Sequence, residues 1–144
     1  MISGITILDT NVVSEPMRPS PSAIVLTWWS QQQPGALFLT SVTVAEILYG
    51  IGLLPHGKRR AALLAGAEQT FGKVLAGRIL PFDEDAARAF PEIAARRRAR
   101  GRPITDLDAQ IAAIASSRGA ILATRNTADF EGCGVQLVNP WAAP

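Results

Sequence analysis

The segment Ile5-Thr6-Ile7-Leu8-Asp9 is an apolar run, interrupted only by a threonine, that ends at an acid. A short run of this kind is typical of a strand that is buried on both faces, as in a parallel sheet. The residues that follow Asp9 are polar and favour a turn. We therefore predict that residues 5–8 form the central strand of the fold and that Asp9 lies at its carboxyl end.

Beyond this strand, the chain alternates between short apolar runs and segments with helical spacing. Further strands are predicted at residues 37–39, 79–80, 121–123 and 135–138. Two helices are predicted at residues 11–15 and 58–76. Four more are predicted to begin after a capping residue, which is Ser20 or Ser22, Ser41, Asp83 and Thr105 in turn. Pro91 should kink the helix that follows Asp83 or divide it. Strands that alternate with helices predict an α/β fold with a mainly parallel sheet.

Length and composition limit the domain organisation and the chemistry. The chain has 144 residues, of which 48% are hydrophobic, and we expect one domain over residues 1–144 without a linker. Cys133 is the only cysteine and His56 the only histidine. A disulfide within the chain, a cysteine-rich zinc module and paired-histidine catalysis are therefore excluded. The net charge of +2 and the isoelectric point near 9.2 are compatible with a weakly basic face.

The N-terminal residues and the uncharged stretch at residues 19–45 bear on localisation. The chain reaches Asp9 without a basic region or a long apolar region, so we expect no secretory signal and a cytoplasmic protein. Serine, glutamine, proline and glycine interrupt residues 19–45 too densely for a membrane span. We therefore expect no membrane association.

Acidic and amide side chains recur where a predicted strand ends or a predicted helix begins. They are Asp9, Glu46, Asp108, Asn126 and Asp129. In an open parallel α/β sheet, ligands bind beyond the carboxyl ends of the strands, where these side chains would meet. Carboxylates gathered there would repel one another unless a cation joined them, and their oxygens suit Mg²⁺ or Mn²⁺. This pattern predicts a metal-dependent nuclease.

Each acid also has a simpler structural interpretation. Asp9 can cap the helix at residues 11–15, Asp108 can form a capping box with Thr105, and Asp129 can serve a turn. Glu46 is harder to explain in this way, because its apolar neighbours predict a largely buried helix, where an unpaired glutamate is costly.

An arginine-rich run comprises residues 96, 97, 98, 100 and 102, at the end of the predicted helix after Asp83. Such a run is typical of a solvated helix end, which the helix dipole favours there. Contact with RNA is the second interpretation. Trp28 and Trp29 fit a core position better than a base-stacking platform.

Six strings, taken in order, resemble a known family. They are LDTNVVSEP (8–16), SVTVAEILYG (41–50), GRILPFDEDAA (77–87), PITDLDAQIAAIA (103–115), LATRNTADFEG (122–132) and VNPW (138–141). The set is similar to the PIN-domain toxins of the VapC type, most closely to the FitB-like branch, over nearly the whole chain. The resemblance implies a three-layer α/β/α fold with a mainly parallel sheet of four to five strands. It also implies a divalent-metal ribonuclease, a homodimer and a cognate VapB-like antitoxin, with operator DNA contacted only through the antitoxin complex.

The same resemblance assigns site residues. Asp9 matches the first acid of the family, Glu46 the second and Asp108 the third, and these would hold Mg²⁺ or Mn²⁺. Many relatives have the fourth acid directly after Thr-Arg, whereas this chain has Asn126 there and Asp129 three residues later. Asn126 can offer a carbonyl oxygen but no charge. Whether Asn126 or Asp129 fills the fourth place stays open at this point.

The leading hypothesis is a toxin of a type II toxin–antitoxin system that cleaves RNA by means of metal-activated water. Two alternatives remain. The first is a catalytically weak or inactive PIN-like binding subunit, which the change at Asn126 would explain. The second is a metal-dependent aspartyl-phosphate phosphatase with Asp9 as the nucleophile. The common phosphatase signature has a second aspartate two positions on, where this chain has Asn11.

Overall fold

A five-stranded parallel sheet forms the centre of the protein in the computed structural model, which describes residues 4–142. The strand order is β3-β2-β1-β4-β5. The strands are β1 (Thr6–Leu8), β2 (Leu37–Thr40), β3 (Ile79–Leu80), β4 (Ile121–Ala123) and β5 (Gln136–Val138). The predicted α/β fold with a parallel sheet is thus confirmed, and β1 occupies the central position.

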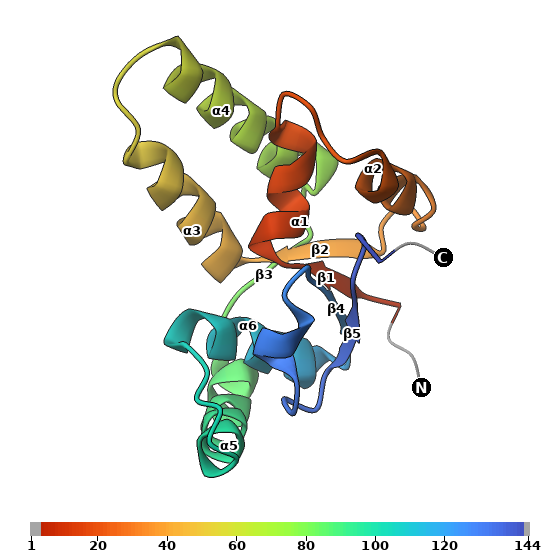
Figure 1. Ribbon diagram of the computed structural model, residues 1–144, viewed down its shortest axis with the longest axis vertical. Coiled ribbons are helices and arrows are strands. Elements are labelled where there is room, and N and C mark those ends of the chain that lie inside the picture. The colour runs from red at the N-terminus through yellow and green to blue at the C-terminus, as the bar shows by residue number, and fades with distance from the viewer. Residues whose placement is uncertain (1–3, 143–144) are drawn as a thin grey trace.

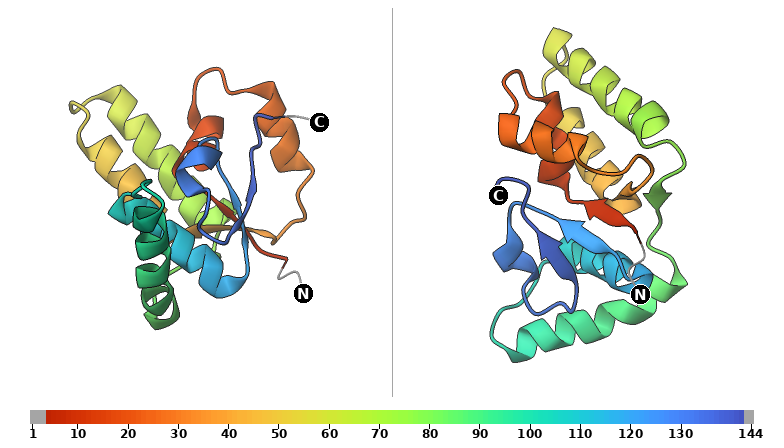
Figure 2. Two further views of the ribbon diagram at one scale, coloured as in Figure 1. Left: turned by 60° about the horizontal axis from the view of Figure 1, so that its bottom comes forward. Right: turned by 90° about the vertical axis from the view of Figure 1, so that its right-hand side faces the viewer.

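Two layers of helices enclose the sheet (Figures 1 and 2). The helices are α1 (Thr10–Ser14), α2 (Ala23–Ser30), α3 (Ser41–Gly52), α4 (Lys58–Gln69), α5 (Glu84–Ala99) and α6 (Asp106–Arg118). Figure 1 shows α1 to α4 on one side of the sheet and α5 and α6 on the other. Within residues 4–142, none of these helices combines the length and the apolar character that crossing a bilayer requires.

The apolar run of β1 supplies both cores. Successive side chains of a strand point to opposite faces of a sheet. Ile7 therefore packs with α5 and α6, whereas Leu8 packs with α1, α3 and α4, and both side chains are 0% exposed. Leu122 of β4 joins the first core and Ala123 joins the second. Burial on both faces is the physical reason for the continuous apolar run.

Two helix boundaries differ from the sequence-based expectations. Thr40, not Ser41, caps α3, because Thr40 keeps an extended backbone at the end of β2 and its hydroxyl accepts a hydrogen bond from the Thr43 N–H at 3.1 Å. The helix predicted at residues 58–76 ends at Gln69 and continues as a π-helical turn over Thr70–Val74. Of the two outcomes expected at Pro91, division of the helix is excluded, because α5 runs from Glu84 to Ala99 with Pro91 inside it.

Candidate active site at the carboxyl edge of the sheet

Asp9 lies at the point where the strand order reverses: β2 and β3 extend the sheet on one side of β1, and β4 and β5 extend it on the other. It follows β1 directly, and β1 is flanked by β2 on one side and β4 on the other. Ligands of open α/β sheets bind at such a switch point. The Asp9 side chain accepts hydrogen bonds from the Thr10 N–H and the Thr124 hydroxyl, each at 2.8 Å, and the residue is only 7% exposed. Asp9 also caps α1, so its capping role and its place in the site coexist.

Glu46 reaches the same edge from the second turn of α3. One of its carboxylate oxygens accepts a hydrogen bond from the Thr10 hydroxyl at 3.0 Å. The prediction of a largely buried helix around Glu46 is wrong, since Glu46 is half-buried and its neighbours Ala45 and Tyr49 are exposed. The reason is that α3 turns a single face, which includes Ile47, toward the core. Glu46 therefore lies at the border between core and solvent.

Asp108 lies in the first turn of α6 and is half-buried. Its backbone N–H donates to the Thr105 hydroxyl at 3.3 Å, which confirms Thr105 as the cap of the helix. Asp106, in the same turn, is exposed. The helix start thus directs one acid toward the sheet edge and leaves the other in solvent.

The carboxylates of this region act on one another electrostatically. Burial raises the pKa of Asp9; hydrogen bonds from Thr124 and Thr10 lower it in part, and the charges of Glu46 and Asp129 raise it further. Burial also raises the pKa of Asp108, to which the charges of Asp9 and Asp129 add, opposed by Thr105 and Arg97. The fold therefore brings four acids from distant parts of the chain into one repulsive group.

Asn126 and Asp129 differ in their relation to this group. Both residues are exposed, and the backbone N–H of Asn126 donates to the Thr124 hydroxyl at 3.1 Å. Asp129 lies in a 3-10 turn, η3 (Thr127–Phe130), and its N–H donates to the Asn126 carbonyl at 3.0 Å. Asp129 is therefore a turn residue, as its simpler interpretation predicts. It is also the residue whose charge raises the pKa of both Asp9 and Asp108.

The donor set has the chemistry of a hard-cation site without a preformed cage. Among residues 4–142, no three acidic, histidine or cysteine side chains stand close enough together to hold a metal ion as a group. Mg²⁺ is usually bound by one or two carboxylates and keeps several waters. The buried carboxylate of Asp9, repelled by its acidic neighbours, fits that mode of binding. Direct ligation by Asp9, Glu46 and Asp108 together stays a prediction.

The burial of one structural residue near the site, Arg97, differs from the sequence-based expectation. Arg97 was assigned with the other arginines to a solvated helix end, but its side chain is buried and donates to the carbonyl oxygen of Glu131 at 2.7 Å. The signal was present in the sequence, because Arg97 continues the helical spacing of Ala86, Phe90 and Ile93. All three pack in the core that α5 shares with α6.

Comparison with known protein sequences gives a consistent family assignment. The model of the PIN domain family matches residues 6–132. The plasmid stability protein StbB of Pseudomonas syringae pv. tomato is 44% identical over 95% of this chain and 99% of that protein. The VapC ribonuclease Y4jK of Sinorhizobium fredii is 41% identical, covering 94% and 96%. Toxin FitB of Neisseria gonorrhoeae is 39% identical, covering 94% and 97%.

Solved structures give the same fold. A FitAB structure bound to a DNA fragment superposes with a TM-score of 0.90 at 38% identity, covering 97% of this chain and 98% of that chain. The FitAcB structure from Neisseria gonorrhoeae gives a TM-score of 0.89 at 38% identity, covering 96% and 99%. The predicted three-layer fold is thereby confirmed.

The raised pKa values of the site acids predict a measurable cost in stability. A folded state that raises a carboxyl pKa binds more protons than the unfolded state, so stability falls as the pH rises from about 4 through the raised value. In a chelating buffer at neutral pH, Asp108→Asn should raise the thermal midpoint by roughly one to three degrees, a modest effect because solvent screens a half-exposed carboxylate. The difference from wild type should shrink toward pH 4.

The matched control is Asp106→Asn, which changes an exposed acid in the same helical turn. Calorimetric melting of the three proteins between pH 4 and pH 7 provides the measurement. A midpoint of Asp108→Asn that is equal to wild type at every pH would show that neither burial nor repulsion places a net cost on the charged Asp108 carboxylate.

Proposed function

Because the chain belongs to the PIN-domain family, we propose that it is a divalent-metal-dependent endoribonuclease and the toxin of a type II toxin–antitoxin pair. The observation that carries this proposal is the acidic group of Asp9, Glu46, Asp108 and Asp129 at the switch point of the sheet. Relatives named VapC ribonuclease and Toxin FitB match across nearly their whole length and support it. We place its action on RNA in the cytoplasm.

Electrostatics explain why such a site needs a cation. A phosphodiester is negatively charged, and the carboxylates would repel it as they repel one another. Asp9 and Asp108 are the residues that would hold Mg²⁺ or Mn²⁺, with Glu46 and Asp129 as further oxygen acceptors around it. A cation held there lowers the pKa of water and neutralises charge that develops on phosphate.

The chain itself orients the acids. Thr124 and the Thr10 N–H each occupy one oxygen of Asp9, and each oxygen keeps a further lone pair for a ligand. The Thr10 hydroxyl holds Glu46 beside Asp9. A carboxylate fixed in this way can accept a hydrogen bond from a water that approaches the phosphorus atom. A side-chain nucleophile is not required.

A groove next to the site suits the antitoxin partner. Its volume is about 790 Å³, Thr10 and Glu46 lie on its lining, and Ile47, Ile51 and Leu63 contribute apolar surface. We assign this groove to an antitoxin segment whose apolar side chains follow α3 and α4 and whose basic side chain reaches the acids. An arginine fork can bridge two carboxylates and so displace the cation. Contact with operator DNA would then pass through the antitoxin.

We also propose that the chain forms a homodimer, which exposed apolar side chains support. Tyr49, Phe82 and Leu107 line a second hollow, of about 440 Å³, which also borders Glu46. All three side chains are exposed, and Tyr49 is 71% exposed. Large apolar side chains gathered on a surface are typical of interaction sites. A second copy bound there would bring two acidic groups close together.

The inactive binding subunit remains the second candidate, since Asn126 replaces an acid. The proposal predicts that Asp9→Asn and Asp108→Asn each lower RNA cleavage at saturating Mn²⁺ by roughly a hundredfold or more, because each removes a charge from the site. Cleavage should also stop in a chelator. Gel assays on purified protein measure both effects, with Asp106→Asn as the control and circular dichroism as the test of folding. Wild-type protein that leaves RNA intact with Mn²⁺ would favour the binding subunit.

The fourth acid can be identified by metal titration. Asp129→Asn should weaken Mn²⁺ binding by roughly tenfold, and Asn126→Asp should strengthen it, if Asp129 has replaced the acid absent at Asn126. Isothermal calorimetry of both variants and of wild type gives the affinities. An affinity of Asp129→Asn equal to that of wild type would assign this residue to the turn alone.

The toxin assignment predicts an effect in cells. Expression of the chain alone should arrest growth, Asp9→Asn should relieve the arrest, and co-expression of the cognate antitoxin should restore growth and give a complex that co-purifies. A peptide that copies the basic antitoxin segment should inhibit cleavage less as the Mn²⁺ concentration rises. Unimpaired growth with soluble, folded wild-type protein would contradict the toxin assignment.

A further inference from the structure

Arg97 is a buried charged residue that has no role in the proposed chemistry. It lies near the C-terminal end of α5 and is 5% exposed. Its Nε donates to the Arg102 carbonyl and one of its terminal nitrogens donates to the Glu131 carbonyl, both at 2.7 Å. The same nitrogen lies 3.5 Å from the Ala128 carbonyl. A buried guanidinium is costly unless its donors are satisfied. Here backbone carbonyls satisfy them, so the side chain fastens chain segments together.

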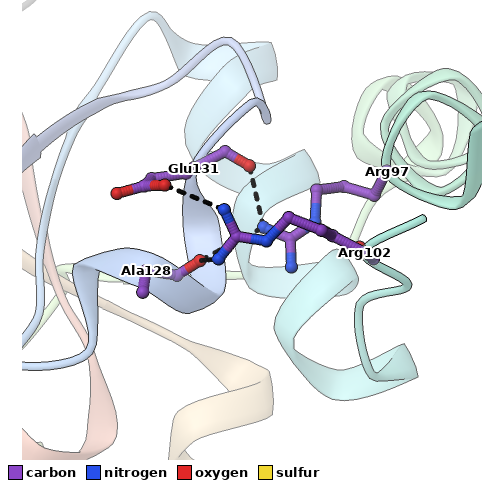
Figure 3. Close-up of polar contacts among 4 residues, drawn as sticks. All are labelled: Arg97, Arg102, Ala128 and Glu131. Carbon is purple, nitrogen blue, oxygen red and sulfur yellow. Dashed lines mark hydrogen bonds and ion pairs between the residues drawn. The ribbon is translucent and has the colours of Figure 1, made fainter. Parts of the chain in front are cut away.

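Arg102 contacts the same segment from the solvent side. One terminal nitrogen lies 3.0 Å from a carboxylate oxygen of Glu131 and the other donates to the Ala128 carbonyl at 3.2 Å. Figure 3 shows both guanidinium groups directed at Ala128 and Glu131. Because Arg97 also binds the Arg102 carbonyl, the two arginines form one connected clamp.

The clamped segment contains Asp129. This residue lies between Ala128 and Glu131, the two contact points of the arginines. The segment has little regular structure of its own, since η3 is a single 3-10 turn and Gly132, which follows it, has a φ of 79°. The buried side chain of Phe130 packs in the hydrophobic core and anchors the turn there. An apolar anchor fixes the depth of a turn, whereas hydrogen bonds to its carbonyls fix the orientation of its backbone, from which the Asp129 side chain extends.

We propose that Arg97 and Arg102 are positioning residues, which hold the Ala128–Glu131 turn so that Asp129 replaces the acid absent at Asn126. This inference rests on the proposed nuclease function and extends it to residues outside the acidic group. The clamp places the carboxylate that acts electrostatically on Asp9 and Asp108. A planar fork that binds two carbonyls at once suits arginine and not lysine.

Arg102 is the residue to vary, because it is half-exposed and its replacement should leave the core intact. Arg102→Met keeps the apolar stem and removes the fork. Arg88→Met is the matched control, since Arg88 is an exposed arginine on α5 that pairs only with Glu84 among the contacts of the described residues. Each change is made in wild type and in Asp129→Asn. Arg97→Lys adds a conservative change within the buried half of the clamp.

The readouts are the rate of RNA cleavage, Mn²⁺ affinity by calorimetry, and amide hydrogen exchange at residues 127–134. Arg102→Met should lower kcat and Mn²⁺ affinity by up to roughly tenfold, which is the loss expected from Asp129→Asn itself and the lower end of the range found when a supporting partner of a metal ligand is lost. Exchange at residues 127–134 should accelerate at an unchanged global melting temperature. In Asp129→Asn, the same substitution should have no further effect on kcat or affinity. Arg97→Lys should show the same pattern, and Arg88→Met should match its parent throughout.

Equal losses from Arg102→Met with and without Asp129 would overturn the proposal, because the arginine would then act independently of that carboxylate. Unchanged exchange at residues 127–134 would overturn it as well. If wild-type protein failed to cleave RNA, the nuclease function would fail on its own. Mn²⁺ affinity and hydrogen exchange would still decide whether the clamp positions Asp129.

Discussion

The burial of Asp9 at the end of β1 and the repulsion from the carboxylates around it are together the constraint on which the site depends. Asp9 is held in that environment by hydrogen bonds from Thr10 and Thr124, which join the ends of two neighbouring strands. Burial nevertheless raises its pKa, so the ionised form of Asp9, which follows the central strand, lowers the stability of the folded state. Such a cost is typical of functional sites, where charges are arranged for a ligand that neutralises them.

The way in which each acid is held divides the site into two parts. Asp9, Glu46 and Asp108 follow or belong to regular elements, whose backbones fix them by local hydrogen bonds and core packing. Asp129 belongs to a short turn and depends on arginines from α5 and from the segment that follows it. Because a turn can be reoriented more readily than a helix, the fourth carboxylate can come from another position in the chain as long as something fastens the turn.

This division also explains what the sequence could predict. Several signals are local: the apolar run before Asp9, the cap at Thr105 and the alternation of strands with helices. They predict the sheet and its central strand, and they place Asp9, Glu46 and Asp108 where a strand ends or a helix begins. Thr40 replaced Ser41 as a cap because both residues can cap and only the strand end decides between them. At Pro91 the sequence left two outcomes open, a kinked or a divided helix, and the structure has a single helix. The proximity of Asp129 to Asp9 arises from tertiary contacts, which no local pattern specifies. The burial of Arg97 is indicated by its helical spacing from Ala86, Phe90 and Ile93, but the carbonyls that it binds are not.

The most direct test of a cation-dependent acidic site is a crystal structure of the protein soaked in Mn²⁺, with anomalous scattering recorded from wild type and from Asp9→Asn. The carboxylate arrangement predicts an anomalous peak at the carboxyl edge of the sheet, in contact with Asp9 and Asp108, that disappears in the variant. No peak at that edge at saturating Mn²⁺, or a peak that persists unchanged in Asp9→Asn, would contradict it.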